Sequence, residues 1–294
     1  MRLNKRAIHE AVAAYLFLLP SFVGLVVFVV LPIIKSFLLS FHNWDLLGAM
    51  KWNGLKNYRQ LIKDPFFIDS LKNTAYFSFV SVPCNICIGL FLAVMLNQKI
   101  RGVKTYRVVY FLPVVCSTVA VALIWQWLYD KDFGVVNYLL NKIGLPGVPW
   151  LTSFVWAMPA VILVAVWKGI GYNMVIFLAG LQGVPAELYE AAKIDGANAW
   201  ARFWHVTLPM ISPTTFFITV MSLIGSFQVF DVTMVLTGGG PGTATITLVQ
   251  YIYRCAFEFF RMGYASAIAY VLFAIVLLFT LIQLGLSKKW VHYQ

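Results

Sequence analysis

The stretch from Pro185 to Pro213, PAELYEAAKIDGANAWARFWHVTLPMISP, lies between two long apolar runs and concentrates charge in a short insert. Glu187 and Glu190 follow the first proline, and Lys193 stands three residues after Glu190. An early proline, acids in the first turns and a base further along are typical of a helix whose charges match its own macrodipole. The stretch therefore predicts a helix that begins just after Pro185.

The second half of the insert predicts another helix. Gly196 is suited to end the first helix, and residues 198–207 can form a second one before Pro209. One interpretation is a helical hairpin that lies on the lipid headgroups. The two acids of the first helix disfavour contact with an anionic membrane surface. We therefore favour a polar element that is presented to a partner.

The composition indicates the class of protein. Hydrophobic residues make up 61% of the 294 residues and charged residues only 11%, whereas about a quarter of a soluble domain is charged. The apolar runs are continuous rather than alternating, which favours helices. We expect an all-α polytopic membrane protein with six transmembrane helices, roughly at residues 13–41, 74–97, 108–129, 153–180, 214–236 and 264–286. The first run is too long for the core of a signal peptide, so we interpret it as a retained helix.

The positions of lysine and arginine predict the orientation in the membrane. Basic residues precede the first span, crowd the short loop after the second span and follow the last span. The longer first loop is also basic, but it carries Asp45, Asp64 and Asp69, so the short second loop decides. We expect a cytoplasmic N-terminus at 1–12, a transmembrane domain at 13–286 with the cytoplasmic insert 185–213, and a cytoplasmic C-terminus at 287–294.

Several kinds of chemistry have no support in the sequence. No GxxxxGK[ST] nucleotide-binding motif occurs, and the four histidines lie in loops or termini. A membrane-embedded hydrolase or metalloprotease needs histidines close to carboxylates, so we expect neither an enzyme nor a metal site. Cys84 and Cys87 have CxxC spacing, but their place inside an apolar run favours packing. The net charge of +11 is spread over many short loops, so we expect no nucleic-acid partner.

Three short patterns in the insert carry a family resemblance: Glu190-Ala191-Ala192, Asp195-Gly196-Ala197 and Leu208-Pro209. Their spacing resembles the EAA loop of binding-protein-dependent ABC importers. The resemblance implies that the insert is a coupling helix, which docks in a cleft of the ATP-hydrolysing subunit. The residues to which it assigns coupling are Glu190, Ala191, Ala192, Asp195, Gly196, Leu208 and Pro209.

Segments elsewhere are similar to the carbohydrate-uptake branch, which includes the maltose, oligosaccharide and glycerol-phosphate permeases. These segments are AYLFLLP at 14–20, NGLKNY at 53–58 and TGGGP at 237–241. The resemblance implies a type I ABC-importer permease in a bacterial cytoplasmic membrane that takes up a carbohydrate by alternating access. The alternatives are a secondary transporter driven by an ion gradient and an ABC importer of a non-sugar solute such as glycerol phosphate.

The same resemblance implies an assembly. The partners are a second homologous permease, two ATPase subunits and an extracytoplasmic solute-binding protein. ATP and magnesium belong to the ATPase subunits, and this chain itself binds no cofactor.

Polar and aromatic residues inside the fourth and fifth spans are the candidate solute pathway, because polar groups at that depth are costly against lipid. Aromatic faces suit the C–H side of a sugar ring, whereas amides and hydroxyls suit its OH groups. The candidates are Trp167, Lys168, Gly169, Tyr172, Ser222, Ser226, Gln228 and Asp231. Lys168 and Asp231 are expected at a common depth, where they either pair or face water separately.

Four of these candidates match the sugar site of the maltose permease in position and broad character. They are Gly169, Tyr172, Ser222 and Ser226. Gly225 and Val229 stand where that permease has larger or more polar contacts. The resemblance therefore does not assign maltose as the solute, and the partner permease remains an alternative place for the solute site.

Overall fold

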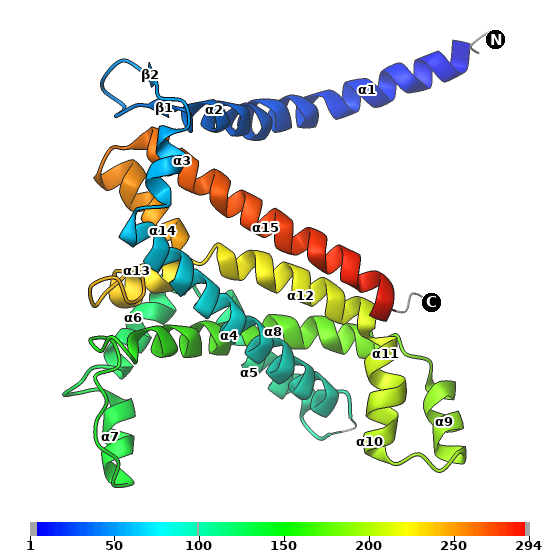
Figure 1. The fold of residues 1–294 in the computed structure, drawn as a ribbon. Coiled ribbons are helices and arrows are strands. Elements are labelled where there is room, and N and C mark those ends of the chain that lie inside the picture. The colour runs from blue at the N-terminus through cyan, green and yellow to red at the C-terminus, as the bar shows by residue number, and fades with distance from the viewer. Residues whose placement is uncertain (1–4, 99, 292–294) are drawn as a thin grey trace. The chain divides into compact units, whose positions relative to one another are not determined.

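The computed structural model describes residues 5–98 and 100–291, which are almost entirely helical (Figure 1). The chain divides into two compact units, and each is described by itself. Among the described residues, the first comprises 5–63 and 252–270, and the second comprises 64–98, 100–251 and 271–291.

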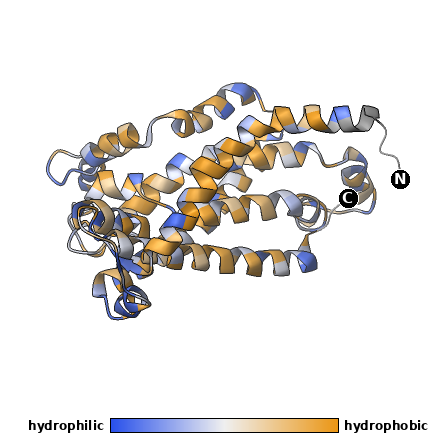
Figure 2. Ribbon diagram, turned by 90° about the horizontal axis from the view of Figure 1, so that it is seen from above, coloured by the Kyte–Doolittle hydropathy of each residue, from blue (hydrophilic) through white to orange (hydrophobic). Residues whose placement is uncertain are grey.

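Helices long and apolar enough to cross a membrane dominate the chain. Four are continuous: Val12–Leu39, Pro65–Leu96, Ala157–Gln182 and Met262–Trp290. Two further pairs pass the same length and composition test but are bent, which allows up to six spans among the described residues. Figure 2 shows hydrophobic residues along these helices and hydrophilic residues mainly in the connecting loops. The expected all-α polytopic fold is confirmed.

The first unit begins with a helical run made of α1 (Lys5–Leu25), a π-helical turn and α2 (Leu31–Leu39). It continues with the two-residue strands β1 (His42–Asn43) and β2 (Lys51–Trp52), which pair antiparallel, and with α3 (Lys56–Leu61).

One buried amide holds the loop of the first unit together. Asn57 donates from Nδ2 to the carbonyl oxygens of Ser40 at 2.8 Å and His42 at 3.0 Å. The neighbouring Tyr58 hydroxyl donates to Ser40 Oγ at 2.8 Å. A buried amide with satisfied hydrogen bonds fixes one loop geometry. The NGLKNY segment at 53–58 therefore has a structural role in this unit.

The second unit contains most of the helices. They are α4 (Pro65–Leu96), α5 (Val103–Val115), α6 (Thr118–Leu128), α7 (Val135–Lys142), α8 (Ala157–Gln182), α9 (Ala186–Ile194), α10 (Ala199–Arg202), α11 (Leu208–Met210), α12 (Ser212–Phe227) and α13 (Asp231–Thr237). Helices α14 (Leu248–Tyr253) and α15 (Met262–Trp290) run across the division between the units.

The core of the second unit forms around α8, which packs extensively on α4 and also on α5, while α12 packs on α4. Phe177 and Met174 of α8 are completely buried in a cluster with Ile218 of α12. Helix α5 comes close because Gly171 has no side chain: a Cβ there would collide with the carbonyl oxygen of Tyr110. These contacts fix α4, α8 and α12 as three walls of one region.

Two of the expected spans are broken rather than continuous. The expected span 108–129 bends by 98° between α5 and α6, at Cys116 and Ser117. The expected span 214–236 stops at Phe227 and resumes at Asp231, where α13 packs against α6. A continuous apolar run predicts burial in lipid or protein, but it carries no signal for a change of direction.

Candidate functional site

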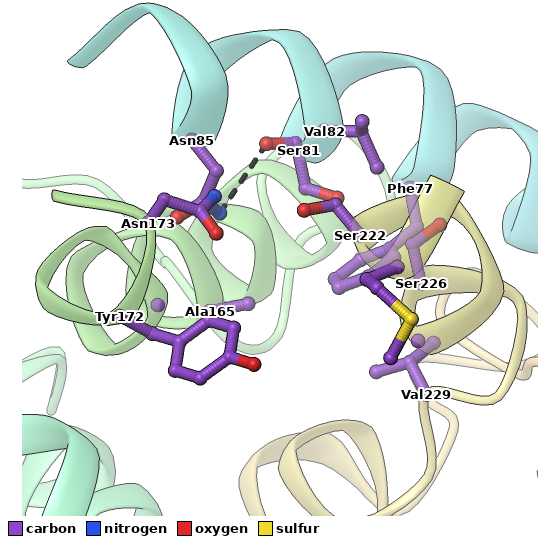
Figure 3. Close-up of a pocket in the computed structure, with 13 residues that line it drawn as sticks. Phe77, Ser81, Val82, Asn85, Ala165, Tyr172, Asn173, Ser222, Ser226 and Val229 are labelled. Atoms are coloured by element: carbon purple, nitrogen blue, oxygen red, sulfur yellow. Dashed lines mark hydrogen bonds between the residues drawn. The ribbon is translucent and has the colours of Figure 1, made fainter. Parts of the chain in front are cut away.

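A cavity of about 310 Å³ lies between α4, α8 and α12, and Figure 3 shows its walls. Side chains from all three helices line it: Phe77, Ser81, Val82, Asn85, Ala165, Gly169, Tyr172, Asn173, Met221, Ser222, Gly225, Ser226 and Val229. None of these residues is ionisable except Tyr172. The cavity therefore offers neutral hydrogen-bonding groups and apolar surface.

The amides of Asn85 and Asn173 supply the most versatile hydrogen-bonding groups of the cavity. Asn85 donates from Nδ2 to the carbonyl of Ser81 at 3.3 Å, while its Oδ1 is buried without a hydrogen-bond partner. Asn173 is 5% exposed. A buried amide oxygen without a partner is costly, and a hydrogen bond from a solute that reached it would satisfy it.

The hydroxyl and aromatic groups complete the lining. Ser226 is buried and donates to the carbonyl of Leu223 at 2.8 Å, which leaves its oxygen lone pairs as acceptors. Ser222 lies one turn earlier on the same face of α12 and is half-buried. The ring of Tyr172 extends from α8 into the cavity (Figure 3) and is 44% exposed. The cavity thus combines an aromatic ring with amides and hydroxyls.

Gly169 on α8 leaves room for the end of the Asn85 side chain from α4. A Cβ placed on Gly169 would stand 2.8 Å from Asn85 Oδ1, closer than real side chains approach. Gly225 on α12 differs, since a Cβ there would meet nothing within 4 Å. The first glycine permits a close contact, whereas the second leaves space open in the cavity.

Four of the eight predicted pathway residues come together here: Gly169, Tyr172, Ser222 and Ser226. The other four lie outside the cavity. Trp167 faces away and packs edge-on against Trp125, with ring centroids 5.5 Å apart. Gln228 is an exposed residue at the C-terminal end of α12.

Lys168 and Asp231 do not pair. Within residues 5–98 and 100–291 the structure has no ion pair between them, and Lys168 Nζ instead donates to the carbonyl of Val114 at 3.4 Å. Asp231 is exposed in the first turn of α13, where an acid suits the helix macrodipole. The two side chains belong to separate environments.

Sequence reasoning missed the contribution of α4, which is Phe77, Ser81, Val82 and Asn85, and it missed Asn173 on α8. Ser81 and Asn85 stand four residues apart in a long apolar run and therefore share one helix face. That spacing indicates a polar face on the helix, but it does not show which neighbour the face meets.

The insert forms the predicted helical hairpin of α9 and α10 (Figure 1). Gly196 ends α9 with φ +77°. Its N–H donates to the carbonyl of Lys193, and the N–H of Ala197 donates to the carbonyl of Ala192, at 3.1 and 2.9 Å. This pair of bonds is the Schellman motif, in which glycine is favoured because its φ is positive. Gly196 is the predicted helix end.

The two arms of the hairpin are linked. Asn198 caps α10 by accepting a hydrogen bond from the N–H of Ala201 at 2.8 Å. The hydroxyls of Tyr189 on α9 and Thr207 in the π-helical turn after α10 lie 3.1 Å apart. Thr207 is buried, so this contact holds α9 against the following helical segment.

The predicted coupling residues divide by exposure. Glu190, Ala191, Asp195 and Gly196 are exposed, whereas Ala192, Leu208 and Pro209 are partly buried. Ile194 at the end of α9 is 87% exposed, although it is apolar. The hairpin therefore presents acidic and apolar side chains together on its surface.

Metal binding has no support in the described residues. Within 5–98 and 100–291 no group of three or more His, Cys, Asp or Glu side chains is arranged to hold a metal ion.

The family model described as "Binding-protein-dependent transport system inner membrane component" matches residues 85–292. The lactose transport system permease protein LacF of Rhizobium radiobacter is 39% identical, with 95% of each chain covered. The arabinooligosaccharides transport system permease protein AraP of Bacillus subtilis is 37% identical, over 95% of this chain and 89% of that protein. The sn-glycerol-3-phosphate transport system permease protein UgpA of Pectobacterium atrosepticum is 34% identical, with 95% of each chain covered.

Solved structures show the same likeness. A chain in the crystal structure of a bacterial ABC transporter that imports the acidic polysaccharide alginate superposes with a TM-score of 0.86. It is 28% identical, and the match covers 97% of this chain and 98% of that one. A related structure of the alginate transporter is in complex with a periplasmic protein that carries an alginate pentasaccharide.

Proposed function

Because this chain belongs to the family of inner membrane components of binding-protein-dependent transport systems, we propose that it imports a carbohydrate through the cavity between α4, α8 and α12. The chain is a multi-pass permease subunit of an ABC importer and not an enzyme. The solute class, the residues along the pathway and the arrangement of partners are proposed from the residues of the cavity and the hairpin.

The lining of the cavity carries the proposal for the solute class. It joins the ring of Tyr172 to the amides of Asn85 and Asn173 and the hydroxyls of Ser222 and Ser226. A sugar presents a C–H face that packs on an aromatic ring and hydroxyls that both donate and accept hydrogen bonds. Neutral donors and acceptors in a partly apolar pocket match that chemistry.

The cavity disfavours a phosphorylated solute. A phosphate is usually bound by arginine, lysine or a helix N-terminus. No lysine or arginine lines the cavity. Glycerol phosphate, which the printed name assigns to UgpA, therefore fits this lining less well than a neutral sugar. The alternative of an ion-gradient carrier is excluded, since the family to which the chain belongs is that of ABC importer permeases.

The hairpin of α9 and α10 is proposed as the coupling element. An amphipathic helix that enters a groove is a common recognition mode, and α9 presents Glu190 and Ile194 on its surface. The partner is an ATPase subunit, which would hold ATP and magnesium, while this chain binds no cofactor. On this proposal the segments 1–12, 185–213 and 287–294 are cytoplasmic, and 13–286 forms the permease domain.

The open side of the cavity favours a second permease as a partner. Tyr172 and Met221 are 44% and 46% exposed, although both line it. A second, homologous permease would close that side. Two ATPase subunits and an extracytoplasmic solute-binding protein complete the proposed assembly.

Exchange of the aromatic ring tests the pathway. Tyr172→Ala in the assembled transporter should raise the KM for carbohydrate uptake by about ten-fold or more, because a ring contact to the solute is lost. Tyr76→Ala is the matched control, since Tyr76 is a similarly exposed tyrosine, 48%, on α4 outside the cavity. Equal KM values for the two variants would contradict the proposed site.

A further inference from the structure

Two adjoining cavities lie where the α9–α10 hairpin meets the C-terminal end of α4. We call the first, of about 640 Å³, the basic cavity, and the second, of about 480 Å³, the apolar groove. They share Val94, Ala199 and Phe203 in their walls. These shared residues place the two cavities next to each other.

The basic cavity carries two cations and no acid. Lys193 from α9 and Arg202 from α10 line it together with Asn97, Gln98 and Tyr189. In the part of the chain that the structure describes, neither Lys193 nor Arg202 forms an ion pair. Two cations without a counter-charge, next to amide and hydroxyl donors, match an anion such as a phosphate diester.

The apolar groove has the opposite character. Leu90 and Phe91 of α4 form one wall, and Trp200, Phe203 and Trp204 form the other. The three aromatic rings pack on one another, with centroids 5.6 to 6.2 Å apart. Trp200 is nevertheless 69% exposed and Trp204 47% exposed. Leu90 and Phe91 lie in the helix Pro65–Leu96, which is long and apolar enough to cross a membrane, so an apolar groove beside them suits an acyl chain.

We propose that the two cavities together bind one anionic phospholipid, with the headgroup phosphate at Lys193 and Arg202 and an acyl chain in the apolar groove. A free phosphate would leave the groove empty. A zwitterionic lipid such as phosphatidylcholine would bring the positive charge of its choline group next to the two cations, Lys193 and Arg202. Tryptophan is enriched at the membrane–water interface, and basic pockets on the cytoplasmic side bind lipid headgroups. The inference rests on the proposed cytoplasmic placement of the hairpin.

The bound lipid would join the hairpin to α4, since each cavity has walls from both. We therefore expect bound anionic lipid to strengthen the coupling of movements of the hairpin to movements of the transmembrane helices. ATPase activity of the assembled transporter should then rise when phosphatidylglycerol replaces phosphatidylcholine.

Native mass spectrometry of the assembled transporter tests this inference directly. The complex is incubated with equal amounts of phosphatidylglycerol and phosphatidylcholine, and the retained lipids are identified. The wild type should retain phosphatidylglycerol selectively. Lys193→Gln combined with Arg202→Gln should abolish the selectivity for phosphatidylglycerol. Ala199→Trp adds a large side chain at the shared wall without changing the charge, and it should lower the retention of lipid. Lys288→Gln combined with Lys289→Gln, the matched loss of two cations at the end of α15, should retain lipid as the wild type does.

Three outcomes would overturn the inference. The first is unchanged selectivity for phosphatidylglycerol in the Lys193 and Arg202 double variant. The second is an equally large loss of selectivity in the Lys288 and Lys289 control. The third is displacement of the lipid by glycerol phosphate alone, which would indicate a phosphate site without an acyl chain. Co-purification of each variant with its ATPase subunit shows that the variant is assembled. The assay contains no solute or solute-binding protein, so a failure of carbohydrate import would leave its result unaffected.

Discussion

The amide oxygen of Asn85 on α4 lies so close to Gly169 on α8 that a methyl group on the glycine would stand 2.8 Å from it. The same oxygen is buried and has no hydrogen-bond partner. The position of this acceptor therefore depends on the absence of a side chain at Gly169.

Gly169→Ala should displace the Asn85 side chain and lower solute affinity, while the complex still assembles. Overpacking at a tight contact costs about 1–3 kcal/mol, so uptake is expected to fall at limiting solute concentration. The control is Gly285→Ala in α15, where a Cβ meets nothing within 4 Å. The measurement is the KM for uptake. An unchanged KM in Gly169→Ala would show that the contact does not position Asn85.

Gly196→Val should uncouple ATP hydrolysis from transport. The glycine has φ +77°, and a β-branched residue in that region costs roughly 1–2 kcal/mol, so the end of α9 is expected to shift. Gly144→Val is the matched control, because Gly144 has φ +79° and is likewise without neighbours around its Cβ. The loop that contains Gly144 is proposed to lie on the side of the membrane opposite to the α9–α10 hairpin.

The assay for this pair is ATPase activity with and without the loaded solute-binding protein. Gly196→Val should lose the stimulation, and Gly144→Val should keep it. Loss of equal size in both would mean that general strain, rather than the coupling hairpin, explains the effect.

Tyr189→Phe should weaken the link between the two arms of the hairpin. It removes the hydroxyl that meets Thr207 at 3.1 Å, and a single hydrogen bond contributes about 0.5–1.5 kcal/mol. Stimulated ATPase activity should therefore fall partly, not completely. Tyr106→Phe, an exposed tyrosine in α5, is the control and should behave as the wild type. Identical stimulation of ATPase activity in both variants would show that the contact between Tyr189 and Thr207 does not contribute to coupling.

Lys168→Met and Asp231→Leu should have independent effects on the stability of the complex. Lys168 donates to the carbonyl of Val114, and Asp231 is exposed at the start of α13. Changes at sites without shared partners add within about 0.5 kcal/mol. Thermal unfolding of the single and double variants measures this. Recovery of stability in the double variant would reveal an ion pair that the structure does not contain.

The hairpin could be predicted from the sequence because its determinants are local. Gly196 supplies a positive φ and Asn198 supplies a cap, and both act within a few residues along the chain. The end of α9 and the start of α10 are therefore readable before any tertiary contact is known. The expected end of the second helix before Pro209 was wrong, since the helical segment continues to Met210. The all-α class followed equally directly from the length of the apolar runs.

The breaks in the spans and half of the cavity could not be predicted in this way. Residues 228–230 separate α12 from α13 because α13 packs against α6, a contact between distant parts of the sequence. Asn85 joins the cavity because α4 turns that face toward α8. In an apolar helix that is surrounded by lipid and protein, the sequence pattern does not show which face meets which neighbour.

On the proposed function, ATP drives a neutral carbohydrate through this permease. The most direct measurement is solute accumulation in proteoliposomes that contain the complete transporter and its loaded solute-binding protein. We expect a carbohydrate to accumulate. This accumulation should require ATP and should persist when proton and sodium gradients are collapsed. Accumulation that follows an ion gradient without ATP, or uptake of glycerol phosphate in place of every carbohydrate, would contradict it.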